Sequence, residues 1–121
     1  MKAASDGHPA PGRTARTLGV RPGIDIPVGI DGLVLGGEGG MSVAPDSPGN
    51  LPAHRRPPEH GGTGKDPIWE IAADDLGGEE LVYREDPLMP GAHGFVEPAS
   101  TTAFQAYETA LLATRQSWRL L

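Results

Sequence analysis

Residues 36–67 read GGEGGMSVAPDSPGNLPAHRRPPEHGGTGKDP, and the rest of the chain is organised around them. They lie between two short apolar segments and follow neither the alternation of a strand nor the periodicity of a helix. Structureless loops longer than about 12–15 residues are uncommon in compact domains and are usually either functional or disordered. We therefore expect a small scaffold that holds a long Gly- and Pro-rich loop against its other elements.

The composition sets limits on the class of protein. A chain of 121 residues forms one domain at most, and its 18 glycines and 13 prolines indicate long irregular segments. Acidic residues outnumber basic ones 16 to 10, giving a net charge of −6. This balance argues against a general affinity for nucleic-acid phosphates. Because the chain has no cysteine, disulfides and thiolate nucleophiles are excluded.

The hydropathy pattern gives no sign of a membrane partner. No apolar run approaches the ~20 residues that a spanning helix needs. The N-terminal residues MKAASDGHPAPGRTAR also lack the apolar core of a secretory signal. We expect the protein to act in a cytoplasm, either that of its own cell or that of a target cell reached without an N-terminal signal.

The N-terminal part of the chain predicts short elements separated by turns. Residues 1–14 are polar and rich in Gly and Pro, so we expect a disordered arm followed by one domain over residues 15–121. Short strands are expected at 15–20, 24–28 and 33–35, with Asp31-Gly32 as a hairpin signal. Met41-Ser42-Val43 forms a second apolar island inside the long loop.

The C-terminal part predicts three more strands and a helix. The strands are expected at 68–72, 81–85 and 93–98. An amphipathic helix is expected over 102–121, which contains no Gly or Pro and whose apolar residues recur at helical spacing. Thr102 and Gln105 fit a capping box at its start. Strands followed by a helix indicate an α+β fold with a small antiparallel sheet.

Several familiar motifs are incomplete. GGTGK (61–65) lacks both the first glycine of a phosphate loop and the Ser or Thr after its lysine, and the glycines at 37 and 39 lack the third glycine of a dinucleotide fingerprint. Gly40-Met41-Ser42 lacks the second glycine of a nucleophile elbow. His54 and His60 have only carboxylates as further ligands, so we expect no metal site.

Four features remain as a candidate site. Arg16 lies in the expected first strand, and Ser42 follows a double glycine. Residues 54–56 (His-Arg-Arg) form a compact cationic group. His93 opens the last expected strand, and Glu97 follows four residues later. Arginine binds phosphate through a bidentate fork, and histidine donates to phosphate or to ribose hydroxyls. Together these residues suit an anionic nucleotide.

Each of these residues also has a structural interpretation. Arg16 suits a surface strand position, and Ser42 suits a turn that it closes through a local backbone bond. The cationic group at 54–56 suits ion pairs with the excess carboxylates. His93 suits a structural hydrogen bond.

Two longer segments add a resemblance. The segment DGLVLGGEGGMSV (Asp31 to Val43) resembles the D-G-L, spacer, G-G-x-S-V segment of a bacterial toxin family. The segment HGFVEPA (His93 to Ala99) resembles the H-x-x-I/V-x-P-A segment of the same family. That family is the second-effector family of the type VI secretion system, which has an ADP-ribosyltransferase-like fold. The order and rough spacing of the segments agree over residues 15–118, and both precede the C-terminal helix.

The resemblance implies a twisted, split antiparallel β-sheet with a cleft for NAD. The resemblance also implies functional residues, and we combine these with the residues of the candidate site described above. The catalytic candidates are Ser42, His93 and Glu97. The candidates for binding NAD are Arg16, Gly40, Ser42, His54, Arg55 and Arg56. Met41 stands where the family has a small hydroxyl residue, and the chain has no Glu-x-Glu signature, so Glu97 is the carboxylate expected to stabilise an oxocarbenium-like state.

The function implied by the resemblance is a toxin that uses NAD to ADP-ribosylate an intracellular protein or nucleic acid. A toxin of this kind has a cognate immunity protein as its partner. A second hypothesis is a non-enzymatic module that docks a partner protein through the Gly36–Pro67 loop. A third is a domain that has lost activity, or one half of a longer toxin.

Overall fold

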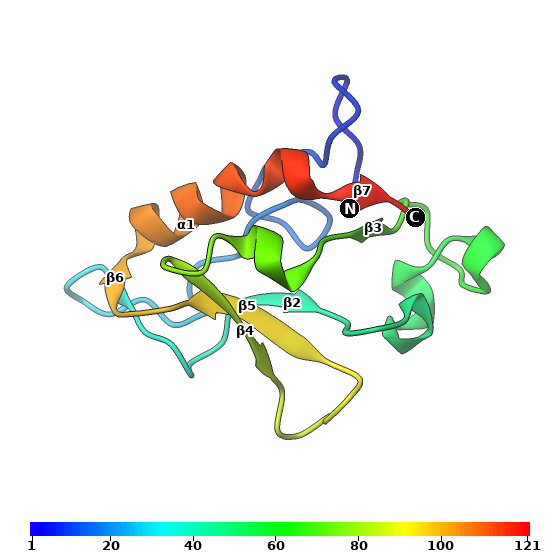
Figure 1. The fold of residues 1–121 in the computed structure, drawn as a ribbon. Coiled ribbons are helices and arrows are strands. Elements are labelled where there is room, and N and C mark those ends of the chain that lie inside the picture. The colour runs from blue at the N-terminus through cyan, green and yellow to red at the C-terminus, as the bar shows by residue number, and fades with distance from the viewer.

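The computed structural model describes all residues from Met1 to Leu121 and has an α+β fold, with short antiparallel sheets and one α-helix (Figure 1). The strands are β1 (Leu33–Val34), β2 (Met41–Val43), β3 (Trp69–Glu70), β4 (Leu81–Glu85), β5 (Gly94–Pro98), β6 (Thr102–Ala103) and β7 (Arg119–Leu120). The helix is α1 (Phe104–Ala113), and the 3-10 helices are η1 (Pro48–Asn50), η2 (Ala53–Arg55), η3 (Pro58–His60), η4 (Ala73–Leu76) and η5 (Arg115–Ser117).

The largest sheet has the order β2-β5-β4, and we call it the central sheet. Its register places Met41, Val96 and Tyr83 side by side on one face, and Ser42, Phe95 and Arg84 on the other. Two-stranded pairs β1-β6 and β3-β7 complete the sheet structure. Thus the prediction of an α+β fold with antiparallel strands is confirmed.

The core lies between the central sheet, helix α1 and the N-terminal segment. Its 13 buried residues include Leu18, Val20 and Ile26 from the first third of the chain, and Tyr107 and Leu111 from α1. The side chain of Tyr107 is 1 % exposed, and burial raises the pKa of its hydroxyl. That hydroxyl donates to the Val96 carbonyl (2.5 Å) and accepts from the Met41 amide (3.2 Å), so it joins two strands of the central sheet.

The strand predictions after residue 30 are largely confirmed. The strand at 81–85 has the predicted bounds, whereas those predicted at 33–35, 68–72 and 93–98 are shorter in the structure. The apolar island at 41–43, for which the sequence predicts no strand, forms β2. The predictions for 15–20 and 24–28 were wrong, since only single bridges form there, Pro11 to Leu18 and Pro22 to Ile26. The nearby prolines lack the N–H groups that a regular ladder needs.

The predicted C-terminal helix ends earlier than residue 121. Its last turn is closed by Thr114, whose hydroxyl donates to the Leu111 carbonyl (2.7 Å) and accepts from the Trp118 indole (2.9 Å). The chain then turns so that β7 can pair with β3. The predicted capping box is also absent: the N-cap is Ala103, and no side chain caps the helix.

The N-terminal segment, for which the sequence predicts a disordered arm, forms a hairpin in the structure (blue in Figure 1). A bridge joins Ala3 to Pro9. Arg115 ties this hairpin to the C-terminal region by donating to the Pro9 carbonyl (2.8 Å) and to the Asp6 carboxylate (2.6 Å). Composition could not reveal these partners because they lie about a hundred residues away.

The long loop is built from β2 and three consecutive 3-10 helices, η1 to η3. Arg56 holds this segment together by donating to the carbonyls of Leu51 (3.0 Å) and His60 (2.8 Å). A Cβ on Gly62 would lie 2.1 Å from the Arg56 carbonyl oxygen, so this glycine allows the chain to pass closely. The segment projects from the body at the right of Figure 1.

Candidate functional site

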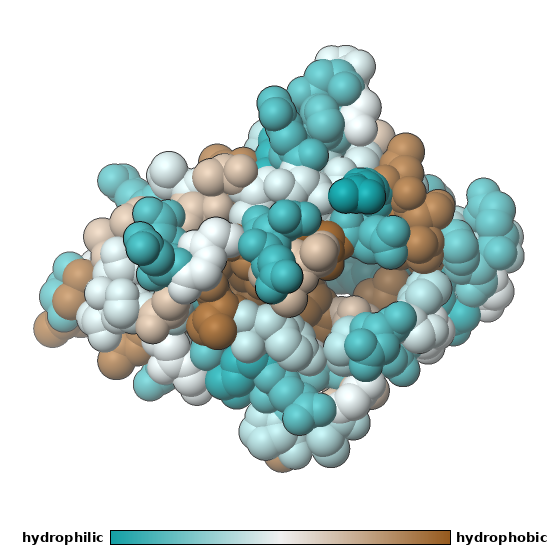
Figure 2. Space-filling view, in the orientation of Figure 1, coloured by the Kyte–Doolittle hydropathy of each residue, from teal (hydrophilic) through white to brown (hydrophobic).

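A cavity of about 740 Å³ opens between the central sheet, the β3–η4 segment and the chain after β2. Ligand sites commonly enclose about 300–1,000 Å³, so its size suits a nucleotide-sized molecule. Figure 2 shows the hollow, with hydrophobic residues inside it and hydrophilic ones around much of its mouth.

The cavity wall is rich in aromatic side chains. Trp69 and Trp118 border it, and both indole N–H groups are already bonded within the chain, to the Met1 carbonyl (2.8 Å) and to the Thr114 hydroxyl (2.9 Å). Tyr83 borders it from β4, and no residue of the chain hydrogen-bonds its hydroxyl. This wall therefore offers apolar ring surface and one free hydroxyl.

The three arginines at the cavity differ in how they are bonded, and Arg21 forms an ion pair with Asp25 (2.8 Å). Arg16 makes a bidentate pair with Asp66 (2.7 and 2.8 Å), and this guanidinium lowers the pKa of the Asp66 carboxyl. Arg55 donates only to the Ala15 carbonyl (2.9 Å) and has no carboxylate partner. The neighbouring His54 is exposed and makes no side-chain hydrogen bond.

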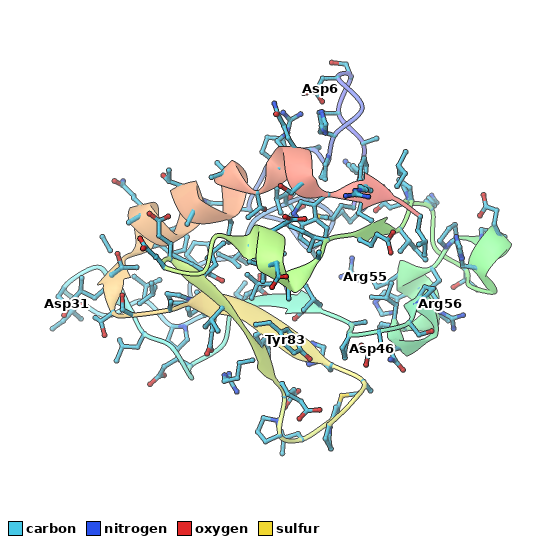
Figure 3. All side chains as sticks on the ribbon, viewed as in Figure 1. Asp6, Asp31, Asp46, Arg55, Arg56 and Tyr83 are labelled. Atoms are coloured by element: carbon cyan, nitrogen blue, oxygen red, sulfur yellow. The ribbon has the colours of Figure 1, made fainter.

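Figure 3 shows Arg55 between β3 and the projecting loop, with Tyr83 and Asp46 near the same opening. Arg55 is thus the cation best placed to accept an anionic group.

His93 borders the cavity just before β5. Its Nδ1 lies 2.8 Å from Oδ2 of Asp86, and its ring meets that of Phe95 edge-on, with centroids 4.9 Å apart. The hydrogen bond from His93 lowers the pKa of the Asp86 carboxyl. One ring nitrogen is therefore engaged, and Nε2 has no partner in the chain.

Ser42 borders the cavity from the edge strand β2, and its hydroxyl makes no hydrogen bond within the chain. Because Ser42 is opposite Phe95, its side chain lies on the outer face of the central sheet.

Glu97 lies on the same outer face and does not border the cavity. Its side chain is 7 % exposed, and Oε2 accepts from the Gly37 amide (2.8 Å) and from Nε of Arg84 (2.8 Å). The Arg84 guanidinium in turn lies over the Phe95 ring, 5.0 Å from its centroid. Glu97 thus anchors the Gly-rich turn to the sheet.

Two predicted NAD-binding residues have structural contacts instead of cavity contacts. Gly40 is buried with φ of 150°, and a Cβ there would lie 2.5 Å from the Val96 carbonyl oxygen. This close packing accounts for the glycine. Arg56, as described above, is committed to carbonyls of its own loop.

Five of the eight predicted site residues therefore border one cavity, although they come from segments far apart in the sequence: Arg16, Ser42, His54, Arg55 and His93. Sequence reasoning missed Tyr83, Asp46 and Asp86. The alternation of 81–85 assigned Tyr83 to a strand but gave no reason to give it a binding role. Asp46, the only non-glycine residue with positive φ (66°), carried no recognisable signal.

Comparison of the chain with protein-family models, with curated proteins and with solved structures finds no match. No three His, Asp or Glu side chains come together in a geometry that holds a metal ion. None of the helices has the length and apolar character needed to cross a bilayer.

Proposed function

We propose that the cavity binds NAD and that the domain is an ADP-ribosyltransferase-like toxin. The observation that supports this most is the meeting of Arg16, Ser42, His54, Arg55 and His93 at a single nucleotide-sized cavity. Charge, motif and resemblance already indicate these five residues in the sequence. The fold supplies an independent reason why they belong together.

The chemistry of the wall fits the parts of NAD. Arg55, which lacks a carboxylate partner, binds the pyrophosphate through its guanidinium fork. The indoles of Trp69 and Trp118 and the ring of Tyr83 give the adenine or nicotinamide an aromatic surface. His93 borders the same cavity.

ADP-ribosyl transfer breaks the bond between nicotinamide and ribose through an oxocarbenium-like state, which a carboxylate stabilises. Glu97 is directed away from the cavity and is bonded to Arg84 and Gly37. Asp46 and Glu70 border the cavity, and neither forms an ion pair or side-chain hydrogen bond within the chain. We assign the electrostatic role to Asp46, which approaches the cavity from the end of β2.

The test is calorimetric titration of the folded protein with NAD. Arg55→Ala removes the unpaired cation, and loss of a charge-assisted contact of about 1.5–3 kcal/mol weakens binding by about ten-fold or more. Arg119→Ala is the matched control, since Arg119 is exposed on β7 and does not border the cavity. Equal affinity in all three proteins, or no binding by the wild type, contradicts the proposal.

Toxicity is tested by expressing the chain in bacteria beside Ser42→Ala and His93→Ala at equal protein levels. Growth arrest by the wild type that His93→Ala relieves supports a toxin, with an immunity protein as its partner. A harmless wild type contradicts this part of the proposal.

The second candidate is a binding module that uses the projecting loop. It is favoured by one observation: η1 to η3 form a lobe held by Arg56 (Figure 3). His54, in η2, is exposed. In this case His54→Ala and Arg55→Ala abolish capture of the partner, while Ser42→Ala and His93→Ala have no effect.

A further inference from the structure

The pair formed by Asp86 and His93 has a feature that NAD binding does not require. Asp86 closes the β4–β5 hairpin and both of its oxygens are used: Oδ1 accepts from the Leu88 amide (2.9 Å) and Oδ2 lies 2.8 Å from Nδ1 of His93. The hydrogen bond from His93 lowers the pKa of this carboxyl, so Asp86 acts only as an acceptor near neutral pH. Nδ1 must therefore carry the proton.

This hydrogen bond fixes which nitrogen of His93 is available. With Nδ1 protonated, the neutral imidazole has its lone pair on Nε2. That atom has no partner in the chain, the side chain is 27 % exposed, and His93 is one of the residues that border the cavity. Contact with the edge of Phe95, 4.9 Å between centroids, restricts the rotation of the ring. A fixed tautomer, a restricted ring and a free Nε2 are what a general base requires.

We infer that Nε2 of His93 is the general base of the transfer reaction and that Asp86 is the positioning residue that orients it. This rests on the proposed function. The acceptor oxygen forms a bond to C1′ of the nicotinamide ribose while the C1′–N bond breaks, and the bonding electron pair leaves with nicotinamide. The acceptor hydroxyl proton passes to Nε2, and the Asp86 carboxylate stabilises the imidazolium that results. The acceptor is accordingly a hydroxyl-bearing group, with water as the simplest case.

The inference is tested first without any activity. Diethyl pyrocarbonate modifies unprotonated imidazole nitrogens, and mass spectrometry gives the rate for each histidine separately. Asp86→Asn places an amide beside Nδ1 that can donate to it, which moves the proton to Nε2. We expect His93 to be modified about ten-fold more slowly, while the rate at His54 stays unchanged.

The matched controls separate positioning from hairpin stability. Glu85→Gln changes the adjacent hairpin carboxylate, which accepts from the Gly91 amide (2.5 Å), and leaves the His93 rate unchanged. Asp86→Glu keeps a carboxylate acceptor and restores most of the rate. Unfolding midpoints identify any variant whose effect comes from loss of structure. An unchanged His93 rate in folded Asp86→Asn overturns the inference.

The second arm measures hydrolysis of NAD by the full chain. General base catalysis contributes about 10²–10⁴-fold, so Asp86→Asn lowers kcat by about a hundred-fold with KM for NAD unchanged. Turnover retained in Asp86→Asn overturns the general-base role while the proposed function stands. A wild type that consumes no NAD contradicts the proposed function, and with it the catalytic role of His93, whatever the modification rates show.

Discussion

The two faces of the central sheet are stabilised by different means. The inner face is mainly apolar: Met41 and Val96 pack in the core, and the Tyr107 hydroxyl joins their backbones. The outer face carries a largely buried ion pair between Arg84 and Glu97, which also binds the Gly-rich turn.

This difference matters for assigning function from sequence. On the inner face, apolar residues predict burial, and Met41 and Val96 are buried in the structure. On the outer face, Glu97 has the residue type of a catalytic carboxylate and a position next to a motif. Its contacts are nevertheless those of a structural anchor, because a buried carboxylate is costly unless it is paired and hydrogen-bonded. Residue type alone does not distinguish the two uses.

The largest effect is expected on the inner face. Gly40→Ala places a Cβ 2.5 Å from the Val96 carbonyl oxygen at a φ of 150°, and we expect a loss of about 3–4 kcal/mol in unfolding free energy. Gly37→Ala, in the same turn, has a φ of 81° and no atom within 4 Å of the new Cβ, so about 1 kcal/mol is expected. Urea denaturation measures both. Equal losses of unfolding free energy in the two variants would show that close packing against Val96 is not the reason why position 40 requires glycine.

The next effect is expected on the outer face. Glu97→Ala leaves Arg84 and the Gly37 amide without their partner, and we expect a loss of about 2–3 kcal/mol, less than for a fully buried pair because Arg84 is 30 % exposed. The control Glu108→Ala removes the exposed pair with Arg13 and should leave the urea midpoint nearly unchanged. A stable Glu97→Ala that no longer consumes NAD would instead restore Glu97 to a catalytic role.

The smallest effect concerns pH. The pKa values of Asp66 and Asp86 are lowered in the folded protein, by hydrogen bonds from Arg16 and His93 respectively. A lowered folded pKa contributes stability that is present above the ordinary value of 3.8 and is lost as the pH falls through the folded value. Tryptophan fluorescence should therefore give a constant urea midpoint near neutrality and a falling one below about pH 4. Arg16→Gln should reduce this decline, and an unchanged acid profile would rule out the Asp66 pair as a contributor.

The sequence predicted the strand at 81–85 because this segment alternates and is bounded by turn residues, but it gave 41–43 only as an apolar island in the long loop. It failed at 15–20, where Leu18 and Val20 are fully buried but the neighbouring segment contains prolines that cannot donate to a ladder. It also extended the helix past Thr114, since no local signal shows that this hydroxyl closes the last turn and accepts from Trp118.

The candidate site was predictable only in part, for a related reason. Charge and motif selected Arg55 and His93, and both border the cavity. They also selected Arg56, whose guanidinium is bonded to the carbonyls of Leu51 and His60. Adjacent arginines have the same chemistry in sequence, and only the path of the loop decides which one is free.

By itself, the sequence determined the α+β class, the strands at 81–85 and 93–98 and the apolar positions that fill the core, because these follow from local alternation, turn residues and hydrophobicity. The tertiary structure alone decided which polar residues meet the cavity and which are anchors. It brings Glu97 into a hydrogen bond with Arg84 and Asp86 into one with His93, and it leaves Arg55 without a carboxylate partner. Hydrogen bonds between segments distant in the chain occupy the donors and acceptors of some polar side chains and leave those of others free. No local sequence pattern shows which side chains are occupied.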